Sequence, residues 1–184
     1  IAQHQNISHY PIHIKLDTGM HRLGFEPHLI SELCSLLKNN NFVKVKSVFS
    51  HLAASDDLQL DDFTKLQFQR FDAMYSELEK VLPSKPIRHI LNTSGIFNYA
   101  EKQMEMVRLG IGLYGIGNSE QELKVLENVS TLKTIISQIR EVAPEESIGY
   151  SRRFRVTQKM KVATIPIGYA DGIRRAWGNE KGFV

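Results

Sequence analysis

The chain has 184 residues, of which 42% are hydrophobic and 23% charged, and its formal net charge is +3 at pH 7. This length suits one domain, or one domain and part of a second, and the apolar fraction excludes a disordered chain. Lysine and arginine are interspersed with aspartate and glutamate, without a basic block or a basic and aromatic stripe. The charge pattern therefore does not favour nucleic-acid binding.

Cys34 is the only cysteine, so no disulfide can form within the chain. It lies in the apolar stretch 33–37, where a packed thiol is expected rather than a nucleophile. No apolar run is long enough to span a bilayer and no signal peptide is visible, which predicts a cytoplasmic protein without a membrane partner. The chain opens at Ile1 rather than at Met and closes at Phe183 and Val184 on a strand-like pattern, so both ends are expected to be cut.

Strands and helices are predicted to alternate over residues 11–128. The expected strands are 11–16, 43–51, 87–91 and 106–111, and the expected helices are 27–38, 60–82, 95–102 and 120–128. Pro27 suits the first turn of its helix, where its missing N–H would have no partner. This order is typical of parallel βα units joined by right-handed crossovers, which makes the chain an α/β protein.

The expected helix 60–82 carries an apolar stripe at steps of three and four residues. Such spacing is typical of a helix face that packs on a core rather than of a cofactor site. The stripe consists of Phe63, Leu66, Phe71, Met74, Tyr75, Leu78 and Leu82.

The pattern changes after residue 128. Residues 131–142 and 159–167 are rich in Val, Ile and Thr, and no long helix is expected between them. The chain is therefore predicted to hold two domains, an α/β domain over 1–128 and the start of a β-rich domain over 129–184.

Charged side chains gather where the first expected strand ends. Apolar and polar residues alternate over 12–17, as in a half-buried strand, and the alternation breaks at Gly19. Arg22 follows between two glycines that allow tight turns. The chain thus delivers Lys15, Asp17 and Arg22 together at the end of one strand, where α/β folds place their chemistry.

Residues 110–115 read Gly-Ile-Gly-Leu-Tyr-Gly, which matches the pattern of a dinucleotide-binding turn. That turn must open a helix directly and be followed by an acidic residue at the tip of the next strand, whereas 117–119 interrupts and no such acid follows. A glycine-rich turn after a strand can instead present backbone N–H groups to a single phosphate, the interpretation we favour. Arg108, on the strand before this turn, needs acceptors and is either a structural ion pair or a ligand contact.

Other polar residues end strands or flank glycines. His51 ends the second expected strand, where a structural role is the more common one. His89 and the segment 92–94 end the third, and the hydroxyls of 92–94 could cap a helix or accept a phosphate. Tyr150 and Tyr169 each lie beside a glycine in the β-rich part, where packing is the common role. No two histidines have metal-ligand spacing on a helix with a third ligand nearby, so no metal site is expected.

Taken in order, six segments resemble the pyridoxal-phosphate-dependent alanine racemases across essentially the whole chain. They are 13–25, 50–56, 89–95, 106–111, 149–150 and 165–172. The resemblance implies a (β/α)8 TIM-type barrel, of which this chain would hold the second half, followed by the start of a C-terminal β domain. It also implies pyridoxal 5′-phosphate as cofactor, and a homodimer, since in this family the β domain of a second subunit completes the site. The implied reaction interconverts L- and D-alanine for peptidoglycan by two acid/base groups.

The resemblance assigns contacts with the pyridine nitrogen and the phosphate of the cofactor to four positions, and further cofactor contacts to Arg22 and His51. Arg108 would face the pyridine nitrogen. An always-charged donor there keeps that nitrogen unprotonated, so that the ring is a weaker electron sink than it is beside a carboxylate. Thr93 and the amides of Gly110 and Ile111 would hold the phosphate.

It assigns substrate and proton-transfer roles to five more. Arg22 would contact the phenolic oxygen of the cofactor and the substrate carboxylate, and Lys15 resembles a family lysine that is often carbamylated and supports that arginine. His51 would lie near the ring and link the arginine at the pyridine nitrogen to Tyr150. Tyr150 resembles the catalytic tyrosine, whose ordinary pKa of about 10 must be lowered by a cationic neighbourhood. Tyr169 resembles a residue on the path of the substrate into the site.

Departures from the family pattern bear on activity. His21 stands where glycine is common, which adds bulk near Arg22, and Thr93 stands where serine is common. No segment resembles Lys-Ala-Asn-Ala-Tyr-Gly, which in the family carries the Schiff-base lysine, also the second acid/base group. Further substrate-site residues, downstream of Val184 in the family pattern, are missing too. The 184-residue chain alone is therefore expected to be inactive.

Alternatives stay open. The chain could belong to a racemase or decarboxylase of the same fold that acts on serine, lysine or ornithine. It could also be a non-catalytic binding or scaffold module, or part of a fusion with a peptidoglycan ligase.

Overall fold

The computed structural model describes residues 4–5 and 7–178. The chain falls into two compact units, Ile1–Ser130 and Thr131–Val184. The strand expected at Phe183 and Val184 lies outside the described residues.

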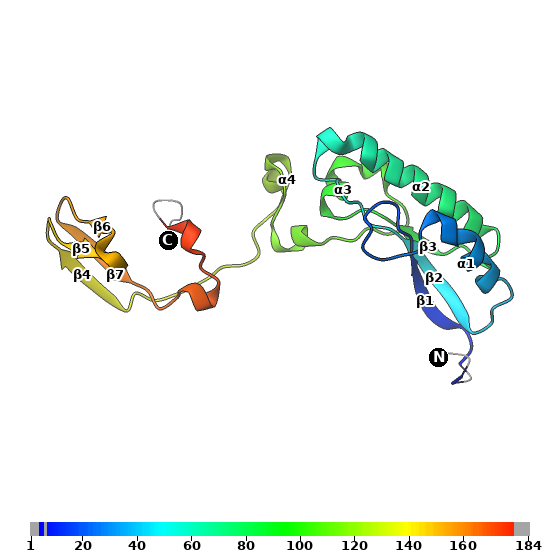
Figure 1. Ribbon diagram of the computed structural model, residues 1–184, viewed down its shortest axis with the longest axis horizontal. Helices are drawn as coiled ribbons and strands as arrows, with labels where there is room; N and C mark the ends of the chain where they lie inside the picture. The colour runs from blue at the N-terminus through cyan, green and yellow to red at the C-terminus, as the bar shows by residue number, and fades with distance from the viewer. Residues whose placement is uncertain (1–3, 6, 179–184) are drawn as a thin grey trace. The chain divides into compact units, whose positions relative to one another are not determined.

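The first unit is built on a three-stranded parallel sheet in the order β1-β2-β3 (Figure 1). Its strands are β1 (Tyr10–Lys15), β2 (Val43–Phe49) and β3 (Ile87–His89), and its first helices are α1 (Ile30–Leu37) and α2 (Asp61–Glu79). A 3-10 turn precedes each helix, at Pro27–Leu29 and Leu58–Leu60. The predicted alternation of strand and helix with parallel pairing is confirmed for this part of the chain.

A register shift in the sheet decides which side chains share a face. Ile12 pairs with Val45, but the next residue, His13, pairs with Ser47, so the intervening residue of β2 is passed over. Such a bulge changes the face to which the following side chains of a strand point. As a result Ser47 and Phe49 lie on the same face of the sheet as His13 and Lys15, away from the helices.

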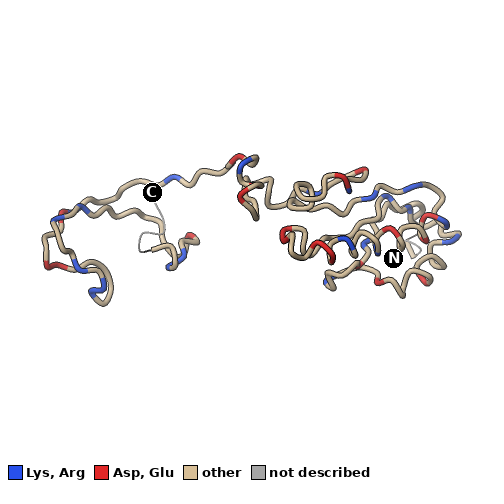
Figure 2. The backbone as a smooth tube through the Cα atoms, turned by 90° about the horizontal axis from the view of Figure 1, so that it is seen from above, with Lys and Arg blue, Asp and Glu red and all other residues tan. Residues whose placement is uncertain are grey.

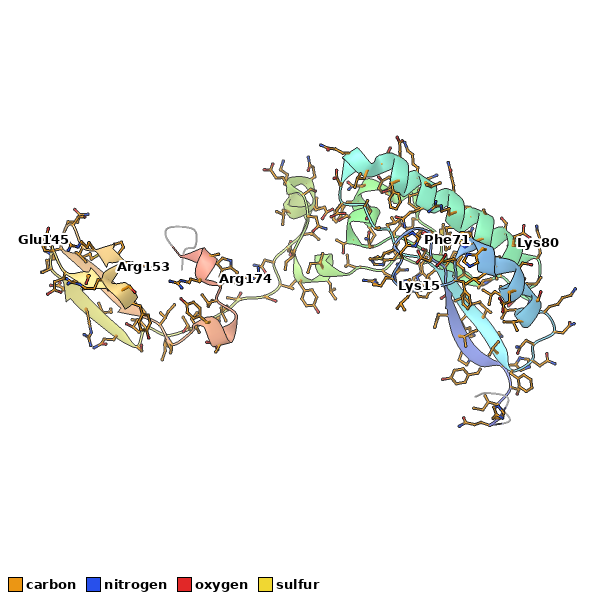
Figure 3. The ribbon with its side chains drawn as sticks, viewed as in Figure 1. Lys15, Phe71, Lys80, Glu145, Arg153 and Arg174 are labelled. Atoms are coloured by element: carbon orange, nitrogen blue, oxygen red, sulfur yellow. The ribbon has the colours of Figure 1, made fainter. Side chains whose placement is uncertain are left out.

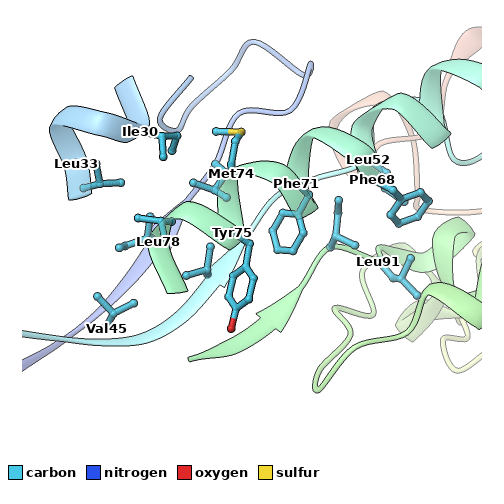
Figure 4. Close-up of a cluster of buried hydrophobic side chains, with 14 of the residues drawn as sticks. Ile30, Leu33, Val45, Leu52, Phe68, Phe71, Met74, Tyr75, Leu78 and Leu91 are labelled. Carbon is cyan, nitrogen blue, oxygen red and sulfur yellow. The ribbon is translucent and has the colours of Figure 1, made fainter. Parts of the chain in front are cut away.

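The core lies between the other face of this sheet and the two helices. Figure 4 shows side chains of α2 meeting those of α1 and of the strands. The buried side chains are Ile14, Leu16, Ile30, Leu33, Val45, Val48, Leu52, Phe68, Phe71, Met74, Tyr75, Leu78, Ile90, Leu91 and Tyr99. Cys34 packs against this cluster, and burial raises the pKa of its thiol.

The predicted stripe on α2 is right in its second half and wrong in its first. Phe71 and Leu78 are fully buried, but Leu66 is 38% exposed, and Gln67 is fully buried in its place. The buried residues step through 64, 67, 68, 71, 74, 75 and 78. Because each residue turns a helix by about 100°, Leu66 lies well off the face that contains Gln67.

The region after α2 departs most from the prediction. The strand expected over 87–91 ends at His89, and the strand expected over 106–111 does not form. The Met106 N–H donates to the Arg88 carbonyl (3.3 Å) and the Arg108 N–H to the Leu91 carbonyl (3.0 Å). A step of two residues on one side against three on the other breaks the even spacing of a parallel ladder.

Short helices follow instead of the two longer ones expected there. The helix expected over 95–102 is α3 (Thr93–Asn98) followed by a 3-10 turn (Ala100–Lys102), because Tyr99 between them has non-helical backbone angles. A 3-10 turn covers Ile111–Tyr114, and α4 (Glu120–Val125) replaces the helix expected over 120–128.

The second unit is β-rich, as expected for that part of the chain. β4 (Gln138–Val142) pairs antiparallel with β7 (Met160–Thr164), and β5 (Ser147–Ile148) pairs antiparallel with β6 (Phe154–Arg155). The longer pair lies within the two stretches rich in Val, Ile and Thr. Short 3-10 turns cover Tyr150–Arg152, Tyr169–Asp171 and Arg175–Trp177.

Charges of both signs are interspersed along the backbone (Figure 2). Over the residues that the structure describes, no helix combines the length and the apolar character needed to cross a membrane.

Candidate active site at the carboxyl ends of the parallel strands

The turn after β1 is organised by a buried aspartate. Asp17 Oδ1 accepts the backbone N–H groups of Gly19 (2.9 Å), Met20 (3.0 Å) and His21 (3.1 Å). Burial alone would raise the pKa of Asp17, but these N–H groups and the nearby His21 ring lower it below the ordinary value. The carboxylate therefore shapes the turn and is not a free acid/base group.

Glycine is required where this turn closes. Gly24 has φ of 120°, and a Cβ there would lie 2.9 Å from backbone atoms of Asp17, Leu16 and Lys15. The chain then returns beside its own strand, since the Phe25 N–H donates to the Lys15 carbonyl (2.9 Å). His21 has φ of 52°, a left-handed conformation that glycine adopts more readily than other residues.

The side chains on this turn differ in exposure. Arg22 is exposed. Lys15, the last residue of β1 and labelled in Figure 3, is half-buried. Burial, followed by the charge of Arg22, lowers the pKa of Lys15. The charge of Arg22 therefore acts on Lys15 at the end of β1.

A buried glutamine ties the ends of β1 and β2 together. Gln67 Nε2 donates to Thr18 Oγ1 and to the His51 carbonyl (both 3.1 Å), and its Oε1 accepts the Ala53 N–H (2.8 Å). Ser50 donates its hydroxyl to the Leu16 carbonyl (2.8 Å), so it accepts from Thr18 (2.8 Å). The loops that carry Arg22 and His51 are therefore held by one polar cluster.

Arg108 is the centre of the site. Its Nη1 donates to His89 Nδ1 (2.6 Å) and to the His89 carbonyl (3.2 Å). Its Nη2 donates to the Ser50 carbonyl (2.6 Å), to His51 Nδ1 (3.2 Å) and to the Ile90 carbonyl (3.4 Å). The guanidinium also lies 5.2 Å from the centre of the Phe49 ring.

All of these partners are neutral, so the positive charge of Arg108 is not compensated by them. Burial lowers the pKa of Arg108, but a guanidinium remains protonated at any ordinary pH. A half-buried cation held only by carbonyls and imidazoles attracts an anion or a lone pair. Of the two sequence-level alternatives for Arg108, the described contacts favour a ligand contact over a structural ion pair.

Both histidines beside Arg108 are held in their neutral form. Burial, and then the charge of Arg108, lowers the pKa of His89 to about 4. Burial, followed by Arg108, Arg22 and Lys15, also lowers the pKa of His51. Because a guanidinium only donates, each Nδ1 must accept, and each imidazole carries its proton on Nε2.

A small cavity opens beside this cluster. It has a volume of about 280 Å³ and is lined by His51, Asn92, Thr93, Ser94, Arg108, Leu109, Gly110, Ile111 and Asn118. This is near the lower end of the range for ligand sites. The cavity suits a small ligand or one end of a larger one.

Thr93 closes the glycine-rich side of the cavity. Its Oγ1 accepts the N–H groups of Gly110 (3.0 Å) and Gly112 (3.2 Å). A Cβ on Gly112 would lie 2.6 Å from Thr93 Cγ2, so this approach needs glycine. Asn92 Oδ1 accepts the Gly95 N–H (2.9 Å), which caps α3. Thr93, Gly110 and Ile111 are therefore brought together, with the Gly110 amide already bonded to Thr93.

A larger groove of about 530 Å³ lies at the amino end of β3 and does not resemble a reaction site. It includes Arg88, whose guanidinium is paired with Glu105 (2.6 Å). The Arg88 N–H groups hold the pKa of Glu105 at about 2, against the opposing effect of burial. Since its main charges compensate each other, we place the candidate site at the other end of the strands.

Tyr150 and Tyr169 lie in the second unit. Tyr150 is 96% exposed and begins a 3-10 turn after Gly149, whose φ is 78°. Tyr169 is 73% exposed and begins another such turn. No group of three His, Cys, Asp or Glu side chains with metal-binding geometry occurs in the described parts of either unit.

Sequence reasoning missed several polar residues that build the site. The face on which Ser47 lies depends on a bulge, which the sequence does not show. Gln67 is a polar residue on the buried face of α2, where apolar residues are expected. Asn118, whose amide donates to Ser94 Oγ (2.9 Å), lay in a segment taken only as an interruption. A polar residue at an apolar step, as at Gln67, is the one signal that a sequence could have offered.

Comparisons with known proteins agree on one family. Its profiles, "Alanine racemase, N-terminal domain" and "Alanine racemase, C-terminal domain", match residues 1–118 and 129–184. Alanine racemase 1 of Oceanobacillus iheyensis is 36% identical over 172 residues, which are 91% of this chain and 45% of that protein.

Solved structures show the same likeness. An alanine racemase from D-cycloserine-producing Streptomyces lavendulae aligns with a TM-score of 0.81 and 27% identity, over 95% of this chain and 47% of that one. An alanine racemase from Bartonella henselae, solved with covalently bound pyridoxal phosphate, aligns with a TM-score of 0.74 and 28% identity, over 95% and 47%. The chain spans about half the length of the relatives it matches.

These likenesses define the fold class as α/β, namely part of a (β/α)8 TIM-type barrel followed by a β-rich domain. The chain belongs to the alanine racemase family.

Proposed function

We propose that this chain forms part of the pyridoxal 5′-phosphate site of an alanine racemase, which interconverts L- and D-alanine. The observation that carries the proposal is the setting of Arg108, a cation surrounded by neutral acceptors beside a glycine-rich cavity. Residues 1–128 would supply the second half of the barrel, and 129–184 the start of the C-terminal domain.

The donors around the cavity fit this cofactor. Thr93 and the Ile111 amide would hold its phosphate, joined by the Gly110 amide once it turns from Thr93 Oγ1, and Arg108 would face its pyridine nitrogen. The relative from Bartonella henselae binds pyridoxal phosphate covalently. When bound, the cofactor withdraws electrons from the α-carbon of the amino acid, which makes the α-proton removable.

The residues of this chain would bind and orient the substrate and move one proton. Arg108 offers only donors, so it cannot give the pyridine nitrogen a full proton and limits how far the ring withdraws electrons. Arg22 would bind the substrate carboxylate and the phenolic oxygen of the cofactor, supported by Lys15, which would be carbamylated. The lowered pKa of Lys15 supports this role, because only a neutral amine reacts with carbon dioxide.

Tyr150 would exchange a proton with the α-carbon, with His51 near it. His51 presents an N–H on Nε2, a donor able to stabilise a tyrosinate. Tyr169 would lie on the path of the substrate. In this proposal a homodimer brings Tyr150 of one subunit to the barrel of the other, in the cytoplasm, for peptidoglycan synthesis.

The proposal is tested by calorimetric binding of N-(5′-phosphopyridoxyl)-L-alanine and its D-alanine counterpart to the 184-residue chain. These stable conjugates need no covalent lysine. A racemase site is expected to bind both enantiomers within a few-fold of each other and to reject the conjugate without phosphate. Pyridoxal phosphate itself is expected to form no covalent adduct with this chain and to yield no D-alanine.

Variants locate the binding. Arg108→Lys keeps a cation but loses the planar fork, and Thr93→Val loses the hydroxyl, so each is expected to weaken binding about tenfold. Thr157→Val, at an exposed position of the second unit, serves as the control. Binding that ignores both site variants, or a preference for a lysine or ornithine conjugate, would contradict an alanine site.

A further inference from the structure

A row of hydrogen bonds crosses the face of the sheet that the helices leave uncovered. His13 Nδ1 lies 2.6 Å from Ser47 Oγ, and Ser47 Oγ lies 3.0 Å from His89 Nε2. His89 Nδ1 in turn lies 2.6 Å from Arg108 Nη1. The row therefore joins one residue of each strand, β1 to β3, to the arginine at the centre of the site.

The direction of each bond follows from Arg108. A guanidinium only donates, so His89 Nδ1 accepts and the neutral ring carries its proton on Nε2. That N–H donates to Ser47 Oγ, which leaves the Ser47 hydroxyl proton free to donate to His13 Nδ1. Arg108 thus fixes the proton of His89, and the Ser47 hydroxyl can serve both neighbouring rings because it accepts as well as donates.

Burial makes the row difficult to rearrange. Ser47 is 1% exposed and His89 is 4% exposed, so neither can turn to water for a replacement partner. The His89 ring is also stacked on Phe49, with ring centres 4.9 Å apart and planes 7° from parallel. The stack fixes the plane of the ring, Arg108 fixes which nitrogen carries the proton, and Ser47 bonds to the protonated nitrogen.

We propose that Ser47, with His13 behind it, is a positioning residue that anchors the Nε2–H of His89 and thereby holds the Nδ1 of the ring against the guanidinium of Arg108. The role of Arg108 toward a ligand rests on the proposed function, but the tautomer does not. In the other tautomer an N–H of His89 would face an N–H of Arg108 at 2.6 Å, and the guanidinium would have to move. Without the Ser47 hydroxyl, the buried Nε2–H of His89 would lose its acceptor on β2, and the ring beside Arg108 would lose one of its two hydrogen-bonded anchors.

The tautomer is measured directly by nitrogen NMR of the histidine rings in the 184-residue chain. At neutral pH His89 is uncharged, because its pKa is about 4. The native chain is expected to show one tautomer of His89, protonated on Nε2. Ser47→Ala is expected to keep this tautomer, because Arg108 still only donates, but to shift the Nε2 resonance, because its N–H loses the Ser47 acceptor. Ser47→Thr, which restores the hydroxyl on a strand, is expected to return the native resonance.

Two further variants grade the effect. His13→Leu removes only the acceptor for the Ser47 hydroxyl, so it is expected to change His89 less than Ser47→Ala does. Ser35→Ala, at an exposed position of α1, is the control for a serine replaced elsewhere. Retained circular dichroism of α1 and α2 shows that a variant is folded.

The result also separates this inference from the proposed function. Ser47→Ala is expected to weaken binding of the phosphopyridoxyl-alanine conjugate about fivefold, which corresponds to about 1 kcal/mol. A single His89 tautomer in a chain that binds no conjugate would support the row of hydrogen bonds and refute the proposed cofactor site. A mixed tautomer in the native chain, or an unchanged Nε2 resonance in Ser47→Ala, would overturn the row.

Discussion

Replacing Gln67 by methionine should destabilise the loops that carry the candidate site. Gln67 is fully buried on α2, and its carboxamide bonds to Thr18, to the His51 carbonyl and to the Ala53 N–H. Methionine has a similar length and no group that replaces these bonds. The variant therefore removes polar contacts with little change in volume.

The size of the effect follows from those contacts. A hydrogen bond contributes about 1 kcal/mol net, and a buried group left without a partner costs about 1–3 kcal/mol. With three bonds lost, partly offset by the burial of an apolar side chain, the free energy of unfolding should fall by about 2–3 kcal/mol. At a typical denaturant dependence this lowers the urea midpoint by about 1 M.

Urea unfolding followed by helical circular dichroism is the assay. All α-helices of the described residues lie in the first unit, so this signal reports on the unit that contains Gln67. Gln69→Met is a matched control, because Gln69 is on the same helix but exposed, and it should change stability by less than about 0.5 kcal/mol. Equal effects of the two substitutions, or none at Gln67, would refute the bridging role.

Four other outcomes are expected. The pKa of His89 is near 6.5 in the unfolded chain and about 4 in the folded one, so the unfolded state binds more protons between these two pH values. The free energy of unfolding should therefore fall by up to about 3 kcal/mol as the pH drops from 6.5 to 4. His89→Asn should flatten this slope when unfolding is measured as a function of pH. Gly24→Ala should cost at least about 2 kcal/mol by thermal or urea unfolding, because a Cβ meets backbone at 2.9 Å; a neutral change would disprove that contact. Glu105→Gln should cost under about 1 kcal/mol despite the carboxyl pKa of about 2, because the pair with Arg88 is more than a third exposed; a larger loss would show a buried ion pair. The 184-residue chain should self-associate in sedimentation, because many large apolar side chains over 106–136 are exposed; a monodisperse monomer would count against this.

Local pattern was enough for much of the first unit. Alternation over 12–17 placed β1, and steps of three and four residues placed α2, because burial of one face imposes a period on any strand or helix. The parallel pairing followed from the order of elements, because a helix between two strands returns the chain to the end of the sheet at which the first strand began. The placement of Lys15, Asp17 and Arg22 near the end of one strand could be predicted from the end of the alternation and from the two glycines around Arg22.

The local sequence pattern did not predict the structure where the conformation of a segment depends on the neighbouring strand or helix. Residues 106–111 have a strand-like composition, but they advance unevenly against β3, so no ladder forms. Leu66 fits an apolar stripe in sequence, yet the helix turns Gln67 to the core instead. Neither outcome can be derived from the residues alone, because each depends on the register of a neighbour.

The sequence by itself determined the βα order, the family resemblance and the position of the polar residues at strand ends. Only the tertiary structure decided that Arg108 is surrounded by neutral acceptors, and that Ser47 and Gln67 support the residues around it. The physical reason is the range of the interactions. Periodicity and turn chemistry act over a few residues, whereas these hydrogen bonds join residues 14 to 58 positions apart, and a bulge of one residue in β2 sets the face of Ser47.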